Sequence, residues 1–474
     1  VDGTGEASNY SLNSTVINIS KRVLNSSGSK SYDASTNAAA ANVTLSNLAG
    51  GQTLGDSGTA TLGSANVGSY TISNLAGISI SDGTGAASNY TLTGGTHTFD
   101  VTQRVLSSSG TRLYNALATA VASDLTLSNL VGSETLTLSG TGTIASKNVS
   151  SNKTVTLNTL AIADGSNGGL AANYTLSSGT HQLTVSQRPV NVSGTRLYNA
   201  LATAVASDLS TMTNLVGSET LTLSSNGTIA SKDVGSNKTV TIGSLSLGNG
   251  SNGGLAANYT LTGGTHRLTV NQRPLNATIA RQYDGTTNAA GSDISSFNDL
   301  QSSETLTMTG TGTVSSKNVA NGQSVTVGSL ALADGSNGGL ASNYSLNSAA
   351  LNITPRAINT VYGSRNYNAS TTVVGSTLSS MTNLVGSETL TLSGNGLLSN
   401  ANAGSNKSVS VGTLALSNGS NGGLASNYTM SGGTHTLTVN QRVVNVSGTR
   451  LYNALATAVA SDLSTMTNLV GSET

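Results

Sequence analysis

The sequence contains no cysteine and no tryptophan, and it has only two phenylalanines and three prolines. The absence of cysteine excludes disulfide bonds, thiolate metal sites and cysteine nucleophiles. Charged residues make up 8% of the chain, and twenty basic residues balance twenty acidic ones. This balance gives no electrostatic reason to bind nucleic acid or an anionic membrane, so we expect neither as a partner.

No stretch of the chain is apolar for long enough to span a bilayer, and no signal peptide opens it. We therefore expect no membrane insertion in this segment, and we expect any export signal to lie outside it. Aromatic residues make up 3% of the chain, so each hydrophobic core should be thin and built from Val, Leu, Ile and Tyr.

Glycine is abundant, with 56 residues. Glycine without proline, among Ser, Thr and Asn, favours tight turns between short strands. A disordered chain would show more charge and no regular apolar alternation. The 474 residues exceed what one core normally serves, so we expect several folded domains.

Two tyrosine motifs recur along the whole chain and reveal an internal repeat of about 84 residues. The first motif is Asn-Tyr, and the second is Tyr followed by Asp or Asn. The Asn-Tyr tyrosines are Tyr10, Tyr90, Tyr174, Tyr259, Tyr344 and Tyr428, and the second set is Tyr32, Tyr114, Tyr198, Tyr283, Tyr367 and Tyr452.

These motifs predict five repeats and two partial ones. The predicted boundaries are 1–21 (partial), 22–103, 104–187, 188–272, 273–355, 356–441 and 442–474 (partial). Residues 190–220 and 444–474 are identical and lie three units apart, which indicates recent duplication within a longer array. We expect any domain that binds or reacts at the tip of such an array to lie outside this segment.

Within a unit, strands are predicted by period-two alternation. Residues 434–439 place His435, Leu437 and Val439 on one face and threonines on the other. Residues 116–125 are the best candidate for a helix, but their counterpart at 285–294 is a poor helix former. We therefore expect an irregular segment or one short helical turn there.

The predicted fold class is all-β, with tandem small antiparallel β modules of about 84 residues, either immunoglobulin-like or β-grasp-like sandwiches. Pro189, Pro274 and Pro355 lie where one unit ends and the next begins, with no flexible linker between them. Such tight joints predict an elongated rod. A β-solenoid is the alternative architecture, although its coils usually repeat at roughly 20–30 residues.

Several landmarks follow one another in a fixed order in each unit. In one unit they are Tyr283-Asp284-Gly285-Thr286-Thr287, Ser316-Lys317-Asn318-Val319, Ala341-Ser342-Asn343-Tyr344 and a closing strand near Arg356. This order resembles the MBG/YDG-type repeats of large bacterial surface proteins, often filamentous-haemagglutinin-like. The Tyr-Asp-Gly triplet is intact only at Tyr283, so the glycine turn is not expected in every unit. The resemblance implies an exported stalk, fibre or adhesin array and no enzyme.

The four histidines share one position of the unit: His97, His181, His266 and His435. Each stands alone in its unit, and Thr15 and Ala349 replace it in the other two. A metal or catalytic role needs partners nearby. We therefore expect a ring at the end of an inward-facing strand row, and we predict no metal site, cofactor or catalytic residue.

A glutamate precedes a lysine by 13 residues in three units: Glu134 and Lys147, Glu219 and Lys232, Glu304 and Lys317. An Asn or Asp follows each lysine, which would allow a Lys–Asn isopeptide bond with the glutamate as proton shuttle. In the next unit, however, Glu388 is matched by Ala401. We therefore favour an ordinary surface ion pair, worth about 0–1 kcal/mol.

The glycine-rich segment 163–174 leads into a strand and not into a helix, so it is not predicted to be a phosphate loop. Asp164 and Asn167 offer oxygen ligands to calcium. Their counterpart at Gly248 has Asn249 in place of the aspartate, which favours a turn stabilised by Asn and Gly.

Arginine, or lysine in the first unit, lies two residues before each tyrosine of the second motif. Residues two apart share a face of a strand, which predicts a cation–π contact. We favour a structural role at a module junction, and stacking on glycans is the alternative. The pairs are Lys30/Tyr32, Arg112/Tyr114, Arg196/Tyr198, Arg281/Tyr283, Arg365/Tyr367 and Arg450/Tyr452.

The sequence therefore predicts a structural repeat segment of an extracellular bacterial fibre or adhesin stalk, at the cell surface or in biofilm matrix. Neighbouring repeats or other copies of the chain are the expected partners, because Thr-rich strand edges with few charges favour self-association. The alternative is a multivalent glycan-binding adhesin.

Overall fold

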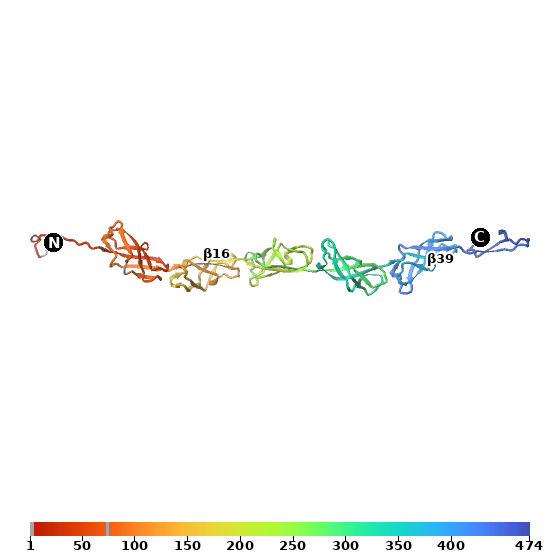
Figure 1. Ribbon diagram of the computed structural model, residues 1–474, viewed down its shortest axis with the longest axis horizontal. Coiled ribbons are helices and arrows are strands. Elements are labelled where there is room, and N and C mark those ends of the chain that lie inside the picture. Colours follow the sequence, from red (N-terminus) through yellow and green to blue (C-terminus); the bar gives the residue numbers. More distant parts are fainter. Residues whose placement is uncertain (1–3, 73–74) are drawn as a thin grey trace. The chain divides into compact units, whose positions relative to one another are not determined.

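The structure is a computed structural model that describes residues 4–72 and 75–474 (Figure 1). Its contacts divide the chain into two compact units: Val1–Ser193, Ser210–Ser225 and Ser244–His266 form one, and Gly194–Leu209, Asn226–Gly243 and Arg267–Thr474 form the other. The division passes through the predicted module 188–272. Each junction between consecutive modules therefore lies inside one unit.

The strands recur with the predicted period. The short 3-10 helix η1 (Ala7–Asn9) comes first. Module 22–103 follows with β1 (Arg22–Val23), β2 (Asn25–Ser31), β3 (Asn37–Ala39), η2 (Ala40–Asn42), β4 (Val43–Ser46), β5 (Leu54–Thr61), β6 (Gly68–Thr71), β7 (Ile78–Asp82), η3 (Ala87–Asn89), β8 (Tyr90–Thr91) and β9 (His97–Thr102).

Module 104–187 contains β10 (Arg104–Val105), β11 (Ser107–Leu113), β12 (Thr119–Val121), η4 (Ala122–Asp124), β13 (Thr126–Ser128), β14 (Leu136–Ser139), β15 (Thr141–Ile144), β16 (Ser150–Thr156), β17 (Ala161–Asp164), η5 (Ala171–Asn173), β18 (Tyr174–Thr175) and β19 (His181–Ser186). Module 188–272 contains β20 (Arg188–Pro189), β21 (Asn191–Leu197), β22 (Thr203–Val205), η6 (Ala206–Asp208), β23 (Thr211–Thr213), β24 (Leu221–Ser224), β25 (Asn226–Ile229), β26 (Gly235–Thr241), β27 (Ser246–Asn249), η7 (Ala256–Asn258), β28 (Tyr259–Thr260) and β29 (His266–Asn271).

Module 273–355 contains β30 (Arg273–Gln282), β31 (Asn288–Ala290), η8 (Gly291–Asp293), β32 (Ile294–Phe297), β33 (Leu306–Thr309), β34 (Thr311–Thr313), β35 (Ala320–Ser324), β36 (Ala331–Asp334), η9 (Ala341–Asn343) and β37 (Tyr344–Thr354). Module 356–441 contains β38 (Arg356–Ala357), β39 (Thr360–Asn366), β40 (Thr372–Val374), η10 (Gly375–Thr377), β41 (Ser380–Met381), β42 (Leu390–Ser393), β43 (Asn395–Leu398), β44 (Gly404–Ser410), β45 (Ala415–Asn418), η11 (Ala425–Asn427), β46 (Tyr428–Thr429) and β47 (Thr434–Asn440). The chain closes with β48 (Asn445–Ser447), η12 (Ala460–Asp462) and β49 (Thr465–Thr467).

The prediction of tandem all-β modules is confirmed. Each helix in the described residues is a single 3-10 turn of three residues, and none of them could cross a membrane. The segment at 116–125 forms strand β12 followed by the turn η4, as expected. The module boundaries remain predictions, and β1, β10, β20, β30 and β38 each begin at or next to one of them.

Most strand pairs in the modules are antiparallel, as predicted, but the modules also contain parallel pairs, which were not expected. The first long strand runs parallel to the last one in modules 22–103, 104–187, 273–355 and 356–441, for example β11 and β19, with Ser108 opposite His181. The main sheet has the order β12-β15-β16-β19-β11-β13 in module 104–187 and β40-β43-β44-β47-β39-β41 in module 356–441. Period-two alternation shows which residues face inward but not the direction of a strand, so the sequence could not reveal this pairing. All strands of each of these sheets come from one module. The β-solenoid alternative, in which sheets would run through successive coils, is therefore wrong.

The core of each module lies beneath this sheet and is thin, as the composition predicts. In β19 the burial alternates, and His181, Leu183 and Val185 are the buried residues. In the second unit, the buried cluster consists almost entirely of Val, Leu, Ile, Ala and Tyr, and it includes Tyr283, Leu351 and Leu437. Figure 1 shows the strands gathered into modules, for example around β16 and around β39.

Consecutive modules follow one another almost without a linker. A single residue, Gln103, separates β9 from β10, and β10 then pairs in parallel with β18 of its own module, with Arg104 opposite Tyr174. The guanidinium of Arg104 donates to the side-chain oxygen of Asn129 at 2.7 Å and to the backbone oxygen of Tyr32 in the preceding module at 3.4 Å. The second tyrosine motif is therefore brought to the joint between modules.

Candidate functional site at the module junctions

A buried glutamate joins two tyrosines of consecutive modules. At the junction of modules 188–272 and 273–355, Tyr198 donates its hydroxyl to Oε1 of Glu304 at 2.6 Å, and Tyr344 donates to Oε2 at 2.7 Å. The two tyrosine rings meet edge to face, with centroids 5.3 Å apart. The Glu304 side chain is 2% exposed. One carboxylate therefore links the two tyrosine motifs that mark the repeat.

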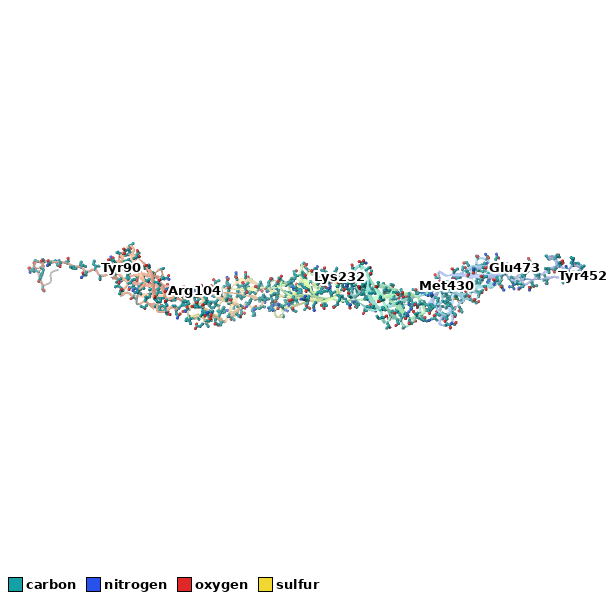
Figure 2. The ribbon with its side chains drawn as sticks, in the orientation of Figure 1. Tyr90, Arg104, Lys232, Met430, Tyr452 and Glu473 are labelled. Atoms are coloured by element: carbon teal, nitrogen blue, oxygen red, sulfur yellow. The ribbon has the colours of Figure 1, made fainter. Side chains whose placement is uncertain are left out.

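A lysine completes this group. Nζ of Lys232, labelled in Figure 2, lies 2.6 Å from Oε1 of Glu304 and 5.8 Å from the centroid of the Tyr198 ring. Lys232 belongs to the first module and Glu304 to the second. The ammonium group thus balances the buried carboxylate from across the junction, and it also faces an aromatic ring.

An asparagine beside the glutamate makes two more hydrogen bonds across the junction, which we call the asparagine clamp. Asn343, fully buried, accepts a hydrogen bond from the backbone N–H of Val234 at 2.9 Å and donates one to Asp233 at 2.9 Å. Both partners belong to the preceding module. The asparagine of the Asn-Tyr motif therefore binds one backbone N–H and one side-chain oxygen of the preceding module.

The same arrangement recurs at the other junctions between complete modules. At each of them, two tyrosine hydroxyls bind one glutamate with distances of 2.6–2.8 Å, and an asparagine binds a backbone N–H at 2.9 Å. The sets are Tyr32, Glu134, Tyr174 and Asn173; Tyr114, Glu219, Tyr259 and Asn258; and Tyr283, Glu388, Tyr428 and Asn427.

The lysine is the variable member of the group. Lys317 lies 3.1 Å from Glu388, and Lys147 lies 3.6 Å from Glu219. At the first junction, Ala65 occupies the equivalent position, between Ser64 and Asn66. The tyrosine hydroxyls are therefore the constant partners of the glutamate, and the lysine adds to them.

The environment of the junction shifts the pKa values of its members. Burial disfavours the charged form of Glu304, but hydrogen bonds from Lys232, Tyr198 and Tyr344 outweigh this effect and hold the pKa of Glu304 below its usual range. Burial, together with the hydrogen bond to Glu304, raises the pKa of Tyr344 to about 12. The pKa of Lys232 is raised by its hydrogen bond to Glu304. The junction thus favours an ionised glutamate and lysine beside neutral tyrosines.

The predicted pairing of glutamate and lysine within one unit is wrong. Glu304 contacts Lys232 of the preceding module, 72 positions earlier, and not Lys317, 13 positions later. The pair is also not an ordinary surface pair, since the glutamate is buried. The residues that follow the lysines take part in the asparagine clamp: Asn148 accepts from Asn258, and Asp233 accepts from Asn343. The sequence did contain one signal. Glu134 is present although position 65 is alanine, and Glu388 is present although position 401 is alanine. The glutamate therefore recurs independently of any one lysine.

The histidines are buried within their modules, at 3–6% exposure, as expected. Nδ1 of His97 lies 2.9 Å from the Ser26 hydroxyl, and Nε2 lies 2.7 Å from the backbone oxygen of Leu92. His181 makes the same two contacts with Ser108 and Leu176. The ring therefore connects the first strand of a module to the turn before its last strand.

Asp164 stabilises a turn. Its Oδ1 accepts a hydrogen bond from the backbone N–H of Ala171 at 2.7 Å, at the start of η5. Asn249 makes the equivalent bond to Ala256 at 2.8 Å. Since only one acceptor oxygen is used, aspartate and asparagine can replace one another. The described residues contain no group of three or more His, Asp or Glu side chains placed to hold a metal ion.

The predicted cation–π contact between arginine and tyrosine is wrong. Arg112 donates to the backbone oxygens of Leu117 and Thr119 and lies 3.1 Å from Asp124, all within its own module. Within the described part of the chain, the cation–π contacts pair Lys232 with Tyr198 and Lys317 with Tyr283. The tyrosines do lie at the junctions, as the structural interpretation predicted.

The turn after the second tyrosine motif is kept in every unit, which the sequence had not predicted. Gly285 has φ of 76°, and the alanines at the same position have φ between 60° and 63°. This left-handed conformation costs a residue with a side chain about 1–2 kcal/mol. The five modules therefore keep the turn even where glycine is absent. The alanines are Ala34, Ala116, Ala200, Ala369 and Ala454.

These features define a tandem array of small β modules joined by buried polar contacts. Comparison with protein families assigns the modules. The YDG domain matches residues 20–98, 101–182, 180–267, 265–352 and 349–436, and the chain belongs to this family. A search of curated proteins found no match.

Proposed function

We propose that this chain is a spacer segment of an extracellular bacterial fibre or adhesin stalk. Its modules would hold a terminal domain away from the cell or build a fibre in the biofilm matrix. The supporting observation is the junction, where a buried carboxylate joins the hydroxyls of two consecutive modules, as Glu304 joins Tyr198 and Tyr344. Contacts of this kind resist bending, because any change in the angle between modules would leave buried polar groups without partners.

The location of the tyrosines favours a spacer over a glycan-binding array. Tyr114, Tyr198 and Tyr283 are fully buried, and Tyr174, Tyr259 and Tyr344 are 1–2% exposed. Rings that bind sugars by stacking must be open to solvent. The residues that recur most regularly are thus used between modules and not on the surface.

Small-angle X-ray scattering of the chain tests this function. We expect the distance distribution of a stiff array, and we expect it to become that of flexibly linked modules when the four junction glutamates Glu134, Glu219, Glu304 and Glu388 are replaced by alanine. The control replaces Glu6, which is exposed, and should leave the distribution unchanged. A wild-type chain that already scatters as flexibly linked modules would contradict the proposal. The location is tested by labelling intact cells with an antibody raised against this segment.

A further inference from the structure

The first and last strands of a module lie side by side and run in the same direction. In module 273–355 these strands are β30 and β37, and all ten residues of β30 pair in parallel with β37. The paired residues run from Arg273 opposite Tyr344 to Gln282 opposite Thr354. The equivalent pairs are β2 with β9, β11 with β19, and β39 with β47. We call such a pair the terminal ladder of its module.

The course of the chain applies any tension to this ladder. In module 104–187 the chain enters at Arg104, in the short strand β10 that precedes β11, and it leaves at Gln187, directly after β19. Because β11 and β19 are parallel, the entry and the exit lie at opposite ends of the ladder. Tension between them therefore pulls β11 along β19 and loads the evenly spaced backbone hydrogen bonds of the ladder together. The residues between the two strands carry no load until the ladder breaks.

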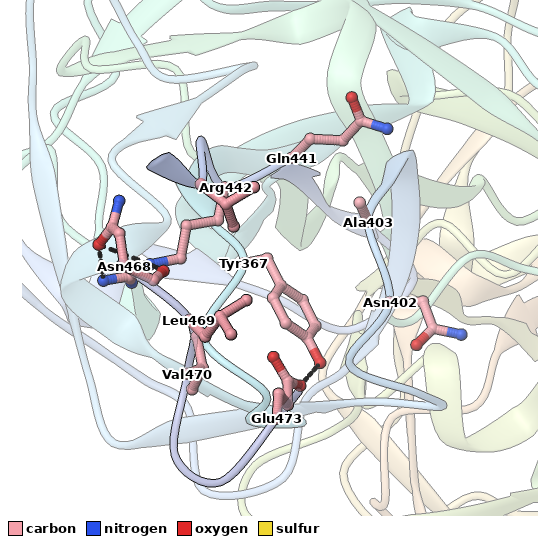
Figure 3. Close-up of a pocket in the computed structure, with 10 residues that line it drawn as sticks. Tyr367, Asn402, Ala403, Gln441, Arg442, Asn468, Leu469, Val470 and Glu473 are labelled. Atoms are coloured by element: carbon pink, nitrogen blue, oxygen red, sulfur yellow. Dashed lines mark hydrogen bonds between the residues drawn. The ribbon is translucent and has the colours of Figure 1, made fainter. Parts of the chain in front are cut away.

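The ends of the two strands lie together where the chain leaves the module. Tyr367 follows β39, and its backbone N–H donates to the backbone oxygen of Asn440, the last residue of β47, at 2.9 Å. Figure 3 shows Tyr367 with Gln441 and Arg442, the next residues after β47, around one cavity. Tension that slides the strands must therefore break this closing bond along with the rest of the ladder.

Side chains couple the same two strands. Ser108 of β11 and His181 of β19 are opposite each other, and the Ser108 hydroxyl lies 2.9 Å from Nδ1 of the histidine. In the ladder of module 273–355, Ile279 and Leu351 are opposite each other and fully buried. Sliding of the strands would therefore break side-chain contacts and expose core residues, in addition to breaking the backbone bonds.

We propose that the terminal ladder makes its module resist tension along the chain. A load that pulls two strands past each other must break many hydrogen bonds at once, whereas a load that peels them apart breaks them one after another. The barrier to unfolding is therefore higher when the strands are pulled along each other, and forced unfolding is governed by the rate of crossing that barrier. The use of this resistance in the cell rests on the proposed stalk function, in which a domain at the far end transmits tension through the modules.

Single-molecule force spectroscopy in two pulling geometries tests the proposal. The chain contains no cysteine, so one introduced cysteine and the C-terminus define where the force acts. Thr287 is exposed and follows the C-terminal end of β30. In Thr287→Cys the force peels module 273–355 from this end, whereas module 356–441 is still pulled along its ladder. The peeled module lengthens the chain by at most about 240 Å, against about 300 Å for a complete module. We expect this short event at the lowest force in the trace.

Asn271→Cys is the matched control, since Asn271 is also exposed and precedes β30. Modules 273–355 and 356–441 are then both pulled along their ladders. Both events should have the full length, and both should occur at a higher force than the short event of Thr287→Cys. Urea unfolding of the two variants should match that of the wild type, so that the difference in force reports the pulling geometry and not a loss of stability.

A short event at the same force as the full-length events would overturn the proposal. The spacer function and the load-bearing ladder can fail separately. A chain that scatters X-rays as flexibly linked modules but shows the difference in force would contradict the spacer function and support the ladder. A stiff array that unfolds at equal force in both geometries would do the reverse.

Discussion

Tyr198 and Glu304 are 106 positions apart in the chain, and the hydroxyl of one donates to the carboxylate of the other at 2.6 Å. Tyr198 belongs to module 188–272 and Glu304 to module 273–355, so this bond crosses the junction. The regular spacing of both residues is therefore explained by the junction, where a repeat unit is completed by its neighbour.

Replacement of Glu304 by alanine should loosen this junction by about 3–5 kcal/mol, because it leaves two tyrosine hydroxyls and the Lys232 ammonium without their buried partner. Glu304→Gln should cost less, since the amide still accepts hydrogen bonds. Hydrogen exchange measured by mass spectrometry should show faster exchange at residues 231–236 and 341–345. Exchange in module 22–103 is the internal control. Unchanged exchange at both segments in Glu304→Ala would refute the role of the glutamate.

The asparagine clamp allows a matched comparison. Asn343 donates to Asp233, whereas the equivalent Asn427 donates to Asn318. Asn343→Asp would place two carboxylates together, but in Asn427→Asp the Asn318 amide can turn and donate. We expect Asn343→Asp to destabilise its junction by at least ~1 kcal/mol more than Asn427→Asp. Urea unfolding followed by hydrogen exchange measures the stability of both junctions. Equal losses of stability in the two variants would contradict the role assigned to the asparagine clamp.

Alkaline pH should open the junctions. The pKa of Tyr259 and of Tyr344 is raised to about 12 in the folded chain, against about 10 for an unfolded tyrosine. The contribution of these two tyrosines to the stability of the folded chain is therefore complete below pH ~10, and it is lost as the pH rises towards 12. Titration of tyrosinate absorbance should show a group of tyrosines that ionise near pH 12. In Glu219→Gln, the pKa of Tyr259 should move down, because the neighbouring negative charge is gone. No such movement would contradict the assigned partner.

The first junction should be strengthened by a lysine. Ala65 stands where the other complete junctions have Lys147, Lys232 or Lys317. Ala65→Lys should stabilise the contact with Glu134 by about 0.5–1 kcal/mol at low salt, and less at high salt. Hydrogen exchange at residues 66–67 is the measurement. Ala65→Gln, which has a long polar side chain without charge, serves as control and should give little gain.

Glycine should be favourable where alanine adopts the left-handed conformation. Ala200 has φ of 60°, so Ala200→Gly should raise the stability of its module by about 1 kcal/mol. Gly285→Ala should have the opposite effect, and a larger one, because its new Cβ would lie 2.6 Å from Cγ1 of Val385. Thermal unfolding of the two variants, compared with the wild type, measures both changes. A loss of stability in Ala200→Gly would show that the turn is not strained.

The histidines and the Asp164 turn illustrate what local pattern can predict. An inward position in an alternating strand predicted that His181 is buried, and the alternation with an acceptor in the next unit predicted that Asp164 stabilises a turn. The junction illustrates the opposite case. A spacing of 13 residues suggested a local pair, but the real partners of Glu304 come from both sides of a joint between modules.

The sequence alone determined the repeat length, the all-β class, the faces of the strands and the tight succession of modules, because all of these follow from periodicity and composition. Only the tertiary structure decided that the first and last strands of a module run parallel, and that tyrosine, glutamate, lysine and asparagine meet between modules. The physical reason is distance along the chain. Contacts between groups that are 40 to 110 positions apart depend on how whole sheets are placed, and no local pattern records that placement.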